Sequence, residues 1–94
     1  MTTTAVDVTV TFTTERPLSQ AAGQKFWRDA TRFAKAAGAY QWEHTVRDAT
    51  LGNAILGAEQ YVHQLAFEDG TTAELVSVAG EVSERTVYPK AGAR

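Results

Sequence analysis

The chain has 94 residues, a formal net charge of −2 and no cysteine. This length fits one domain around one hydrophobic core, and we expect order from about residue 5 to residue 89. The acidic balance argues against a nucleic-acid partner, which would call for clustered Lys and Arg. The lack of cysteine excludes disulfides and thiolate metal sites.

No apolar run is long enough to cross a bilayer, and residues 1–5 lack the basic and apolar parts of a signal peptide. We therefore expect a protein with no membrane partner that resides in the cytoplasm. Arg28, Arg32 and Lys35 form a short basic strip, which we interpret as a solvated surface and not as a phosphate-binding site.

Residues 5–14 alternate strictly between apolar and polar side chains, which predicts a β-strand. Threonine fills most of the polar side, so this face is expected to meet water. The apolar side is β-branched or aromatic throughout and consists of Val6, Val8, Val10 and Phe12.

Residues 19–38 show apolar side chains at spacings of three and four, which predicts one long amphipathic helix. Ser19 is a good N-cap, and Gly38 suits the left-handed position after a helix end. The apolar stripe consists of Ala22, Phe26, Trp27, Ala30, Phe33, Ala34 and Ala37.

After Gly38 the period of the pattern becomes two, which predicts strands over residues 40–48 and 59–67. The segment between them, residues 48–58, is open to three interpretations: a long loop, a short helix or a hairpin tip. Asp69-Gly70 is typical of a tight turn. Further strands are predicted at 72–79 and 82–88, with a turn at Gly80-Glu81 between them and Pro89 as the stop.

These elements predict an α+β fold in which one long helix packs across a single antiparallel sheet of four to five strands. The expected order is β-α-β-β-β-β. A ferredoxin-like arrangement, in which residues 72–85 form a second helix, is the alternative. Gly80 and the β-branched Val76, Val78 and Val82 argue against that second helix.

The order of elements from about residue 6 to residue 88 resembles the cystatin fold. Cystatins carry a Gln-x-Val-x-Gly hairpin tip followed by tyrosines, and Asn53-Ala54-Ile55-Leu56-Gly57 with Tyr61 occupies the equivalent place. This chain lacks a glycine before the first strand and a Pro-Trp pair in the last hairpin. The resemblance implies a cystatin-like fold and, through it, inhibition of a protease.

Glycines flank several large aliphatic side chains in the segment around residues 51–57. An exposed tip of this kind would need a protein partner, whereas a tip that folds back would close the end of the core. We therefore predict a partner-binding site made of Leu51, Asn53, Ile55 and Leu56.

Aromatic and histidine side chains gather on the predicted strands around residues 40–46 and 59–67. They either complete the core or line a concave sheet face that holds a small apolar ligand or supports a minor enzyme activity. The residues of this alternative ligand site are Tyr40, Trp42, His44, Tyr61 and His63.

No nucleophile, phosphate-loop or dinucleotide motif is present, and two histidines without a third ligand do not make a metal site. We therefore predict no catalytic residue, no metal and no cofactor. The expected function is a small soluble protein-interaction module without catalytic activity, acting on a protein partner of unknown identity through a hydrophobic loop or a sheet edge. The strand at residues 5–14 has no lysine or proline to protect it, so a homodimer is also expected.

Overall fold

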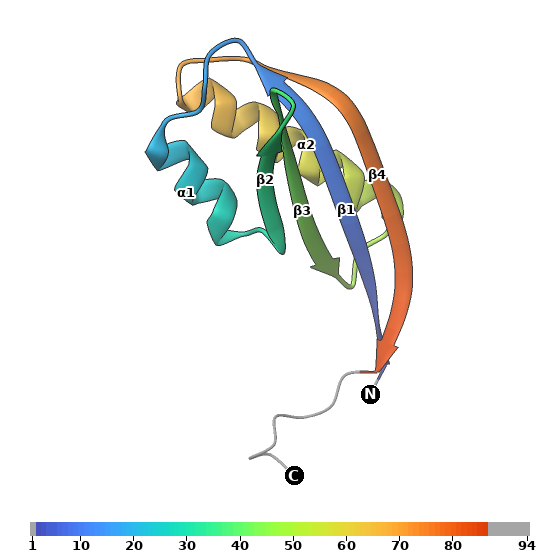
Figure 1. Cartoon of the computed structure of the whole chain (residues 1–94). Coiled ribbons are helices and arrows are strands. Elements are labelled where there is room, and N and C mark those ends of the chain that lie inside the picture. The colour runs from blue at the N-terminus through green and yellow to red at the C-terminus, as the bar shows by residue number, and fades with distance from the viewer. Residues whose placement is uncertain (1, 87–94) are drawn as a thin grey trace, which may run out of the picture.

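The computed structural model describes the backbone of residues 2–86 and the side chains of residues 4–82. Within that range the chain forms one antiparallel sheet, in the order β2-β3-β1-β4, with two helices against one of its faces (Figure 1). The predicted α+β class with a single antiparallel sheet is confirmed. The elements are β1 (Thr2–Thr14), α1 (Gln20–Arg28), β2 (Arg32–Ala36), β3 (Ala39–Arg47), α2 (Leu51–Glu68) and β4 (Ala73–Thr86).

The element order is β-α-β-β-α-β, and each helix connects two strands that have a third strand between them. This is the split βαβ topology of ferredoxin-like domains. The sequence alternative had that topology but placed its second helix at residues 72–85, which is wrong because those residues belong to β4. The second helix is α2.

The prediction for β1 is confirmed, since its apolar side chains are all buried beneath the helices. β1 pairs with β3 on one side and with β4 on the other. Both of its edges are therefore hydrogen-bonded within the chain. This corrects the idea that this strand could offer a free edge to a second copy.

The predicted helix at 19–38 begins correctly but ends nine residues in. Ser19 is the N-cap, with its Oγ 3.2 Å from the backbone nitrogen of Ala22. After α1 the backbone N–H of Thr31 donates to the carbonyl oxygen of Glu43 at 2.7 Å. Pairing with β3 in a hairpin draws residues 32–36 into the sheet, and these ladder bonds outweigh the helical propensity of the alanines.

Gly38 adopts a positive φ, as expected, but in a hairpin and not at a helix end. Ala37 and Gly38 have φ values of 52° and 78° and form the two-residue connection between β2 and β3. Positive φ at both central positions is the requirement of a type I′ turn.

The strand predicted at 59–67 is wrong, because residues 51–68 form one continuous helix, α2. α2 also takes in residues 51–58 of the segment 48–58, for which a helix was one of the three interpretations, and it leaves no hairpin tip where the cystatin resemblance placed one. Thr50 caps its start by accepting from the backbone N–H of Asn53 at 3.2 Å. Its buried side chains recur at helical spacing and are Ala54, Ala58, Val62, Leu65 and Ala66.

The predicted turn at Asp69-Gly70 is the C-terminus of α2. Gly70 has a φ of 76°, and its N–H donates to the carbonyl oxygen of Phe67 at 3.0 Å. The N–H of Thr71 donates to the oxygen of Ala66 at 3.0 Å. This pair of bonds is the Schellman motif, in which glycine takes the left-handed position.

β4 is one strand where the sequence predicted two strands and a turn. Gly80 lies inside it, and a Cβ placed there would come within 2.6 Å of Leu51 Cδ1 and 3.2 Å of Ile55 Cδ1. The glycine therefore admits the first turns of α2 against the sheet instead of reversing the chain. The predicted strand end at 87–88, the stop at Pro89 and residues 90–94 lie outside the described residues.

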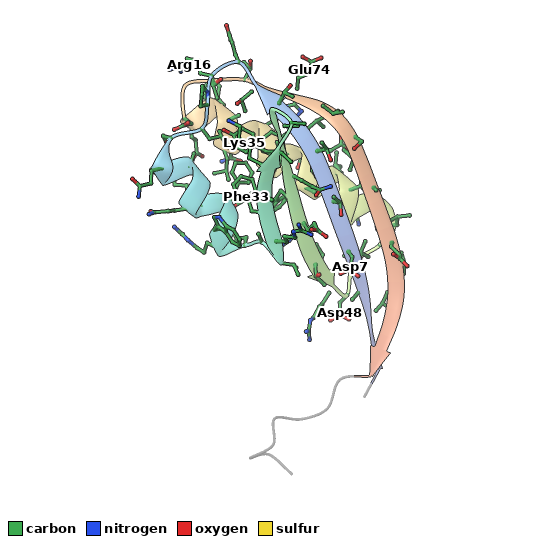
Figure 2. The ribbon with its side chains drawn as sticks, in the orientation of Figure 1. Asp7, Arg16, Phe33, Lys35, Asp48 and Glu74 are labelled. Atoms are coloured by element: carbon green, nitrogen blue, oxygen red, sulfur yellow. The ribbon has the colours of Figure 1, made fainter. Side chains whose placement is uncertain are left out.

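The core lies between the sheet and the two helices. Phe26 of α1 is fully buried, and its ring centroid lies 5.3 Å from that of Phe12 and 5.1 Å from that of Phe33. Phe33 projects from β2 toward the helices (Figure 2). Neither helix in the described part of the chain has both the length and the apolar character needed to cross a membrane.

Candidate functional site

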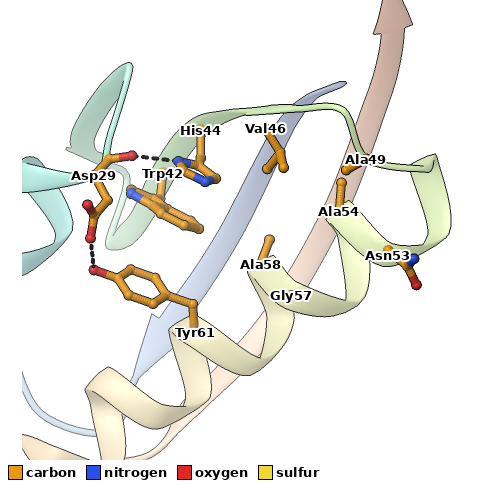
Figure 3. A pocket seen from close by; sticks show the side chains of 10 residues that line it. All are labelled: Asp29, Trp42, His44, Val46, Ala49, Asn53, Ala54, Gly57, Ala58 and Tyr61. Atoms are coloured by element: carbon orange, nitrogen blue, oxygen red, sulfur yellow. Dashed lines mark hydrogen bonds between the residues drawn. The ribbon is translucent and has the colours of Figure 1, made fainter. Parts of the chain in front are cut away.

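A cleft of about 290 Å³ lies between β3 and α2, beside the C-terminal end of α1 (Figure 3). Its lining is mainly apolar. β3 contributes one wall and α2 the other, and Asp29 stands at the end where α1 meets them. The side chains of Trp42, His44, Val46 and Tyr61 enclose the cleft together with small residues of α2.

Three rings form a stack at the Asp29 end of the cleft. Trp42 and His44 are two residues apart on β3, so both point to the helix face of the sheet. Their ring centroids are 4.9 Å apart with an interplanar angle of 9°, and the Tyr61 centroid lies 4.9 Å from that of Trp42 at 25°. All three rings line the cleft.

The wall formed by α2 consists of small residues at helical spacing, namely Ala54, Gly57 and Ala58. Ala54 and Ala58 are buried, whereas Gly57 is exposed and a Cβ added to it would meet no atom within 4 Å. Larger aliphatic side chains at these positions would fill the space between the helix and β3. The cleft therefore exists because α2 carries almost no side chain where it faces Trp42 and Val46.

Asp29 is the C-cap residue of α1 and connects the two walls. Its backbone carbonyl oxygen lies 2.6 Å from His44 Nδ1, and its carboxylate oxygen Oδ2 lies 2.7 Å from the hydroxyl of Tyr61. Figure 3 shows both bonds, one on each side of the residue. A single residue thus fixes the orientation of a ring from the sheet and a ring from α2.

The hydroxyl of Tyr61 also lies 3.1 Å from the carbonyl oxygen of Lys25. Burial, followed by the hydrogen bond to Asp29 and its negative charge, raises the pKa of Tyr61 to about 12. The phenol therefore stays protonated at neutral pH and remains a donor to Asp29.

The position of Trp42 is fixed by a hydrogen bond to α1. It is 1% exposed, and its indole Nε1–H donates to the carbonyl oxygen of Phe26 at 3.1 Å. Because Phe26 is itself buried in the core, the position of the indole is determined by the packing of α1 on the sheet. The wall of the cleft is a continuation of the core.

The predicted ligand site is only partly assembled. Trp42, His44 and Tyr61 come together, although Tyr61 arrives from a helix and not from the predicted strand. Tyr40 is in the core, where its hydroxyl accepts from the backbone N–H of Leu18 at 3.0 Å. His63 lies on an exposed position of α2 and does not line the cleft.

Asp29 is the residue of the cleft that the sequence did not indicate. It lies within the predicted helix of residues 19–38 but outside its apolar stripe. Only the position of the end of α1 could have pointed to Asp29, because the carbonyl oxygen of a C-cap residue has no partner within its helix and can accept a hydrogen bond from elsewhere. Among the described residues no group of three or more His, Asp and Glu is arranged to hold a metal ion.

The predicted partner site is divided by the geometry of α2. Leu51 and Ile55 turn toward Gly80 of β4, and Asn53 stands at the rim of the cleft. Leu56 is 54% exposed and faces away from both. These four residues therefore do not form one exposed loop tip.

A second hollow lies on the opposite face of the sheet, with a volume of about 550 Å³. Its lining combines apolar and polar surface and includes the carboxylates of Asp7, Glu43 and Glu81. Thr45 Oγ1 donates to Asp7 Oδ1 at 2.6 Å, and Glu43 lies 3.8 Å from Arg32 Nε. Its lining has a larger polar share than the lining of the cleft beneath the helices.

Comparison of the chain with protein-family models, with curated proteins and with solved structures gives no match. The cystatin resemblance is therefore not tested by any relative. The class that the geometry defines is a split βαβ domain with an aromatic-walled cleft between its sheet and its second helix.

Proposed function

We propose that this protein binds a compact, mainly apolar ligand in the cleft between β3 and α2. The observation that carries the proposal is the apolar space of about 290 Å³ beside the stack of Trp42, His44 and Tyr61. Ligand sites in proteins are concave, mostly apolar and furnished with a few convergent polar groups. The cleft has these three properties.

The size of the space limits the ligand. Pockets for drug-sized molecules start at roughly 300 Å³, so this cleft fits a ligand at the small end of that range. The walls are rigid because Trp42 is fixed by the core and Tyr61 is fixed by Asp29. A single aromatic ring with a short substituent is the shape that suits such a slot.

The test uses toluene as a probe and follows backbone and indole N–H signals by NMR. Binding is expected to shift the signals of Trp42, Ala54 and Ala58. Gly57→Leu is the decisive variant, since it adds a side chain to the cleft at a helical position where the Cβ meets nothing. It should abolish these shifts while raising stability, because glycine disfavours helix by about 1 kcal/mol.

Gly52→Leu is the matched control, because Gly52 is in the same helix, also has open space around it and does not line the cleft. Toluene binding should survive this change. Absence of shifts at the cleft in the unaltered protein would refute the proposal. So would normal binding by a folded Gly57→Leu variant.

A second candidate function, a protein interaction through a sheet edge, is favoured by β4. This strand has 14 residues and lies at one end of the sheet order, so one of its sides has no strand partner among the described residues. Val76 is 62% exposed and Val82 49% exposed along it. Such an edge can add a strand from another chain, including a second copy of this protein.

The mass in solution tests this second candidate. Light scattering well above micromolar concentration should give twice the chain mass, and Val76→Lys should restore the monomer, because charge on an edge strand opposes pairing. Lysine at Leu56, an exposed side chain on α2, serves as the control and should leave the mass unchanged. A monomer in the unaltered protein would rule out self-pairing at β4.

A further inference from the structure

The hydrogen-bond donors at the aromatic end of the cleft are all used inside the protein. The indole N–H of Trp42 donates to Phe26, and the single hydroxyl proton of Tyr61 is shared between Asp29 and Lys25. A donor that already has a good acceptor gains little from a ligand acceptor. Among the described residues that line this end of the cleft, the indole and the phenol are therefore not free to donate to a ligand.

By contrast, the acceptors at the same end of the cleft still have lone pairs that a ligand donor could use. The partner of His44 Nδ1 is a backbone carbonyl oxygen, which can only accept, so Nδ1 carries the proton. In the neutral ring this leaves Nε2 as a bare acceptor. Figure 3 shows the ring projecting from β3 into the cleft.

Asp29 adds a second set of acceptors. An ionised carboxylate can accept about four hydrogen bonds, and Tyr61 supplies one of them. Asn53, which could supply an amide N–H, stands at the other end of the cleft (Figure 3).

From this imbalance we infer that the cleft selects ligands whose polar head is a hydrogen-bond donor, a hydroxyl or an N–H group, held by His44 Nε2 and the Asp29 carboxylate. The inference rests on the proposed ligand-binding function and defines the ligand class: an apolar ring with a donor head. Ligands whose head only accepts, and above all carboxylates, bind more weakly, because they would face acceptors and the carboxylate of Asp29.

Three probes of similar shape separate these possibilities. The para-cresol molecule carries a hydroxyl donor, 4-fluorotoluene has a fluorine of similar size that cannot donate, and para-toluate carries a carboxylate. Their dissociation constants are measured by NMR titration of the unaltered protein. Cresol should bind about five-fold or more tightly than fluorotoluene, the factor that one net hydrogen bond provides. Toluate should bind most weakly.

The variant His44→Phe keeps a flat ring next to Trp42 and removes the acceptor. It should bind fluorotoluene as before and lose the preference for cresol. His63→Phe is the matched control, because it makes the same change at the exposed histidine outside the cleft, and it should keep the preference. The comparison of probes on the unaltered protein needs no variant, so it stands even if His44→Phe does not fold.

The outcomes distinguish this inference from the function on which it rests. If neither cresol nor fluorotoluene shifts signals of the cleft, the ligand-binding function itself fails. If both bind and fluorotoluene or toluate binds as tightly as cresol, the cleft binds ligands but the assignment of a donor head is overturned. A preference for cresol that persists in folded His44→Phe would remove His44 from the assignment.

Discussion

The hydroxyl of Tyr61 donates to the carboxylate of Asp29 across 2.7 Å, and this bond ties the middle of α2 to the end of α1. Lys25 Nζ and Glu68 Oε1 form a further contact between the helices at 3.5 Å, but the Asp29–Tyr61 bond joins two residues that line the cleft. The geometry of the candidate site therefore depends on a bond between residues 32 positions apart in the sequence.

Removal of the Tyr61 hydroxyl should destabilise the protein modestly. Tyr61→Phe leaves the Asp29 carboxylate without its donor, and we expect a loss of about 1 kcal/mol in the free energy of unfolding, measured in urea. The change should depend on Asp29: in an Asp29→Ala background the same substitution should cost clearly less. Equal costs in both backgrounds would show that the bond contributes nothing.

The pKa of Tyr61 predicts a loss of stability at alkaline pH. The folded value of about 12 lies above the ordinary value of 10.0, so the protonated phenol favours the folded state. This contribution is fully present below the ordinary pKa and is lost as pH rises through the folded pKa. Urea unfolding across that range should show the decline, and Tyr61→Phe should reduce it. An unchanged pH profile in the variant would assign the decline to other groups.

Asp69 predicts a loss of stability at acid pH. Hydrogen bonds from the Ser19 hydroxyl and the Ser19 backbone N–H, the latter at 2.9 Å, lower the pKa of this carboxyl below 3.8. Its contribution is present above the ordinary pKa and is lost as pH falls through the folded pKa. Asp69→Asn should flatten the acid limb of the stability profile, and an unchanged acid limb in this variant would contradict the assignment.

Gly80 and Leu51 should behave as a coupled pair. A side chain at Gly80 would collide with Leu51, so Gly80→Val is expected to cost roughly 1–3 kcal/mol, the usual range for overpacking. Shortening the partner should relieve the collision, and Gly80→Val should cost less in a Leu51→Ala background. If Gly80 were a turn residue instead, Leu51→Ala would bring no relief.

The tautomer of His44 can be read directly. NMR correlations between the carbon-bound ring protons and the ring nitrogens distinguish the two neutral tautomers of histidine. We expect the proton of His44 on Nδ1, because the carbonyl oxygen of Asp29 accepts a hydrogen bond from it. His63 lies exposed and provides the reference within the same spectrum. A proton on Nε2 of His44 would contradict the bond and would remove the bare acceptor from the cleft.

Local sequence patterns determined the parts of the fold that depend on neighbouring residues. The alternation of β1, the N-cap at Ser19 and the positive φ at Gly38 and Gly70 were all evident in the sequence. Each follows from the chemistry of one residue or from the period of a short run. For the same reason Trp42 and His44, two positions apart on one strand, could be assigned to one face.

Three assignments required the tertiary structure. Residues 32–36 have the composition of a helix but pair with β3, and residues 59–67 alternate like a strand but continue α2. Gly80 reads as a turn but makes room for Leu51. In each case the deciding partner lies outside the short run itself, so the pattern of that run does not contain it.

By itself, then, the sequence determined an α+β domain and several of its capping and turn residues. Only the tertiary structure decided that Asp29, His44 and Tyr61 meet, since they come from the end of one helix, the centre of a strand and the middle of another helix. Their chemistry arises from the distances between them, and those distances follow from the packing of both helices on the sheet.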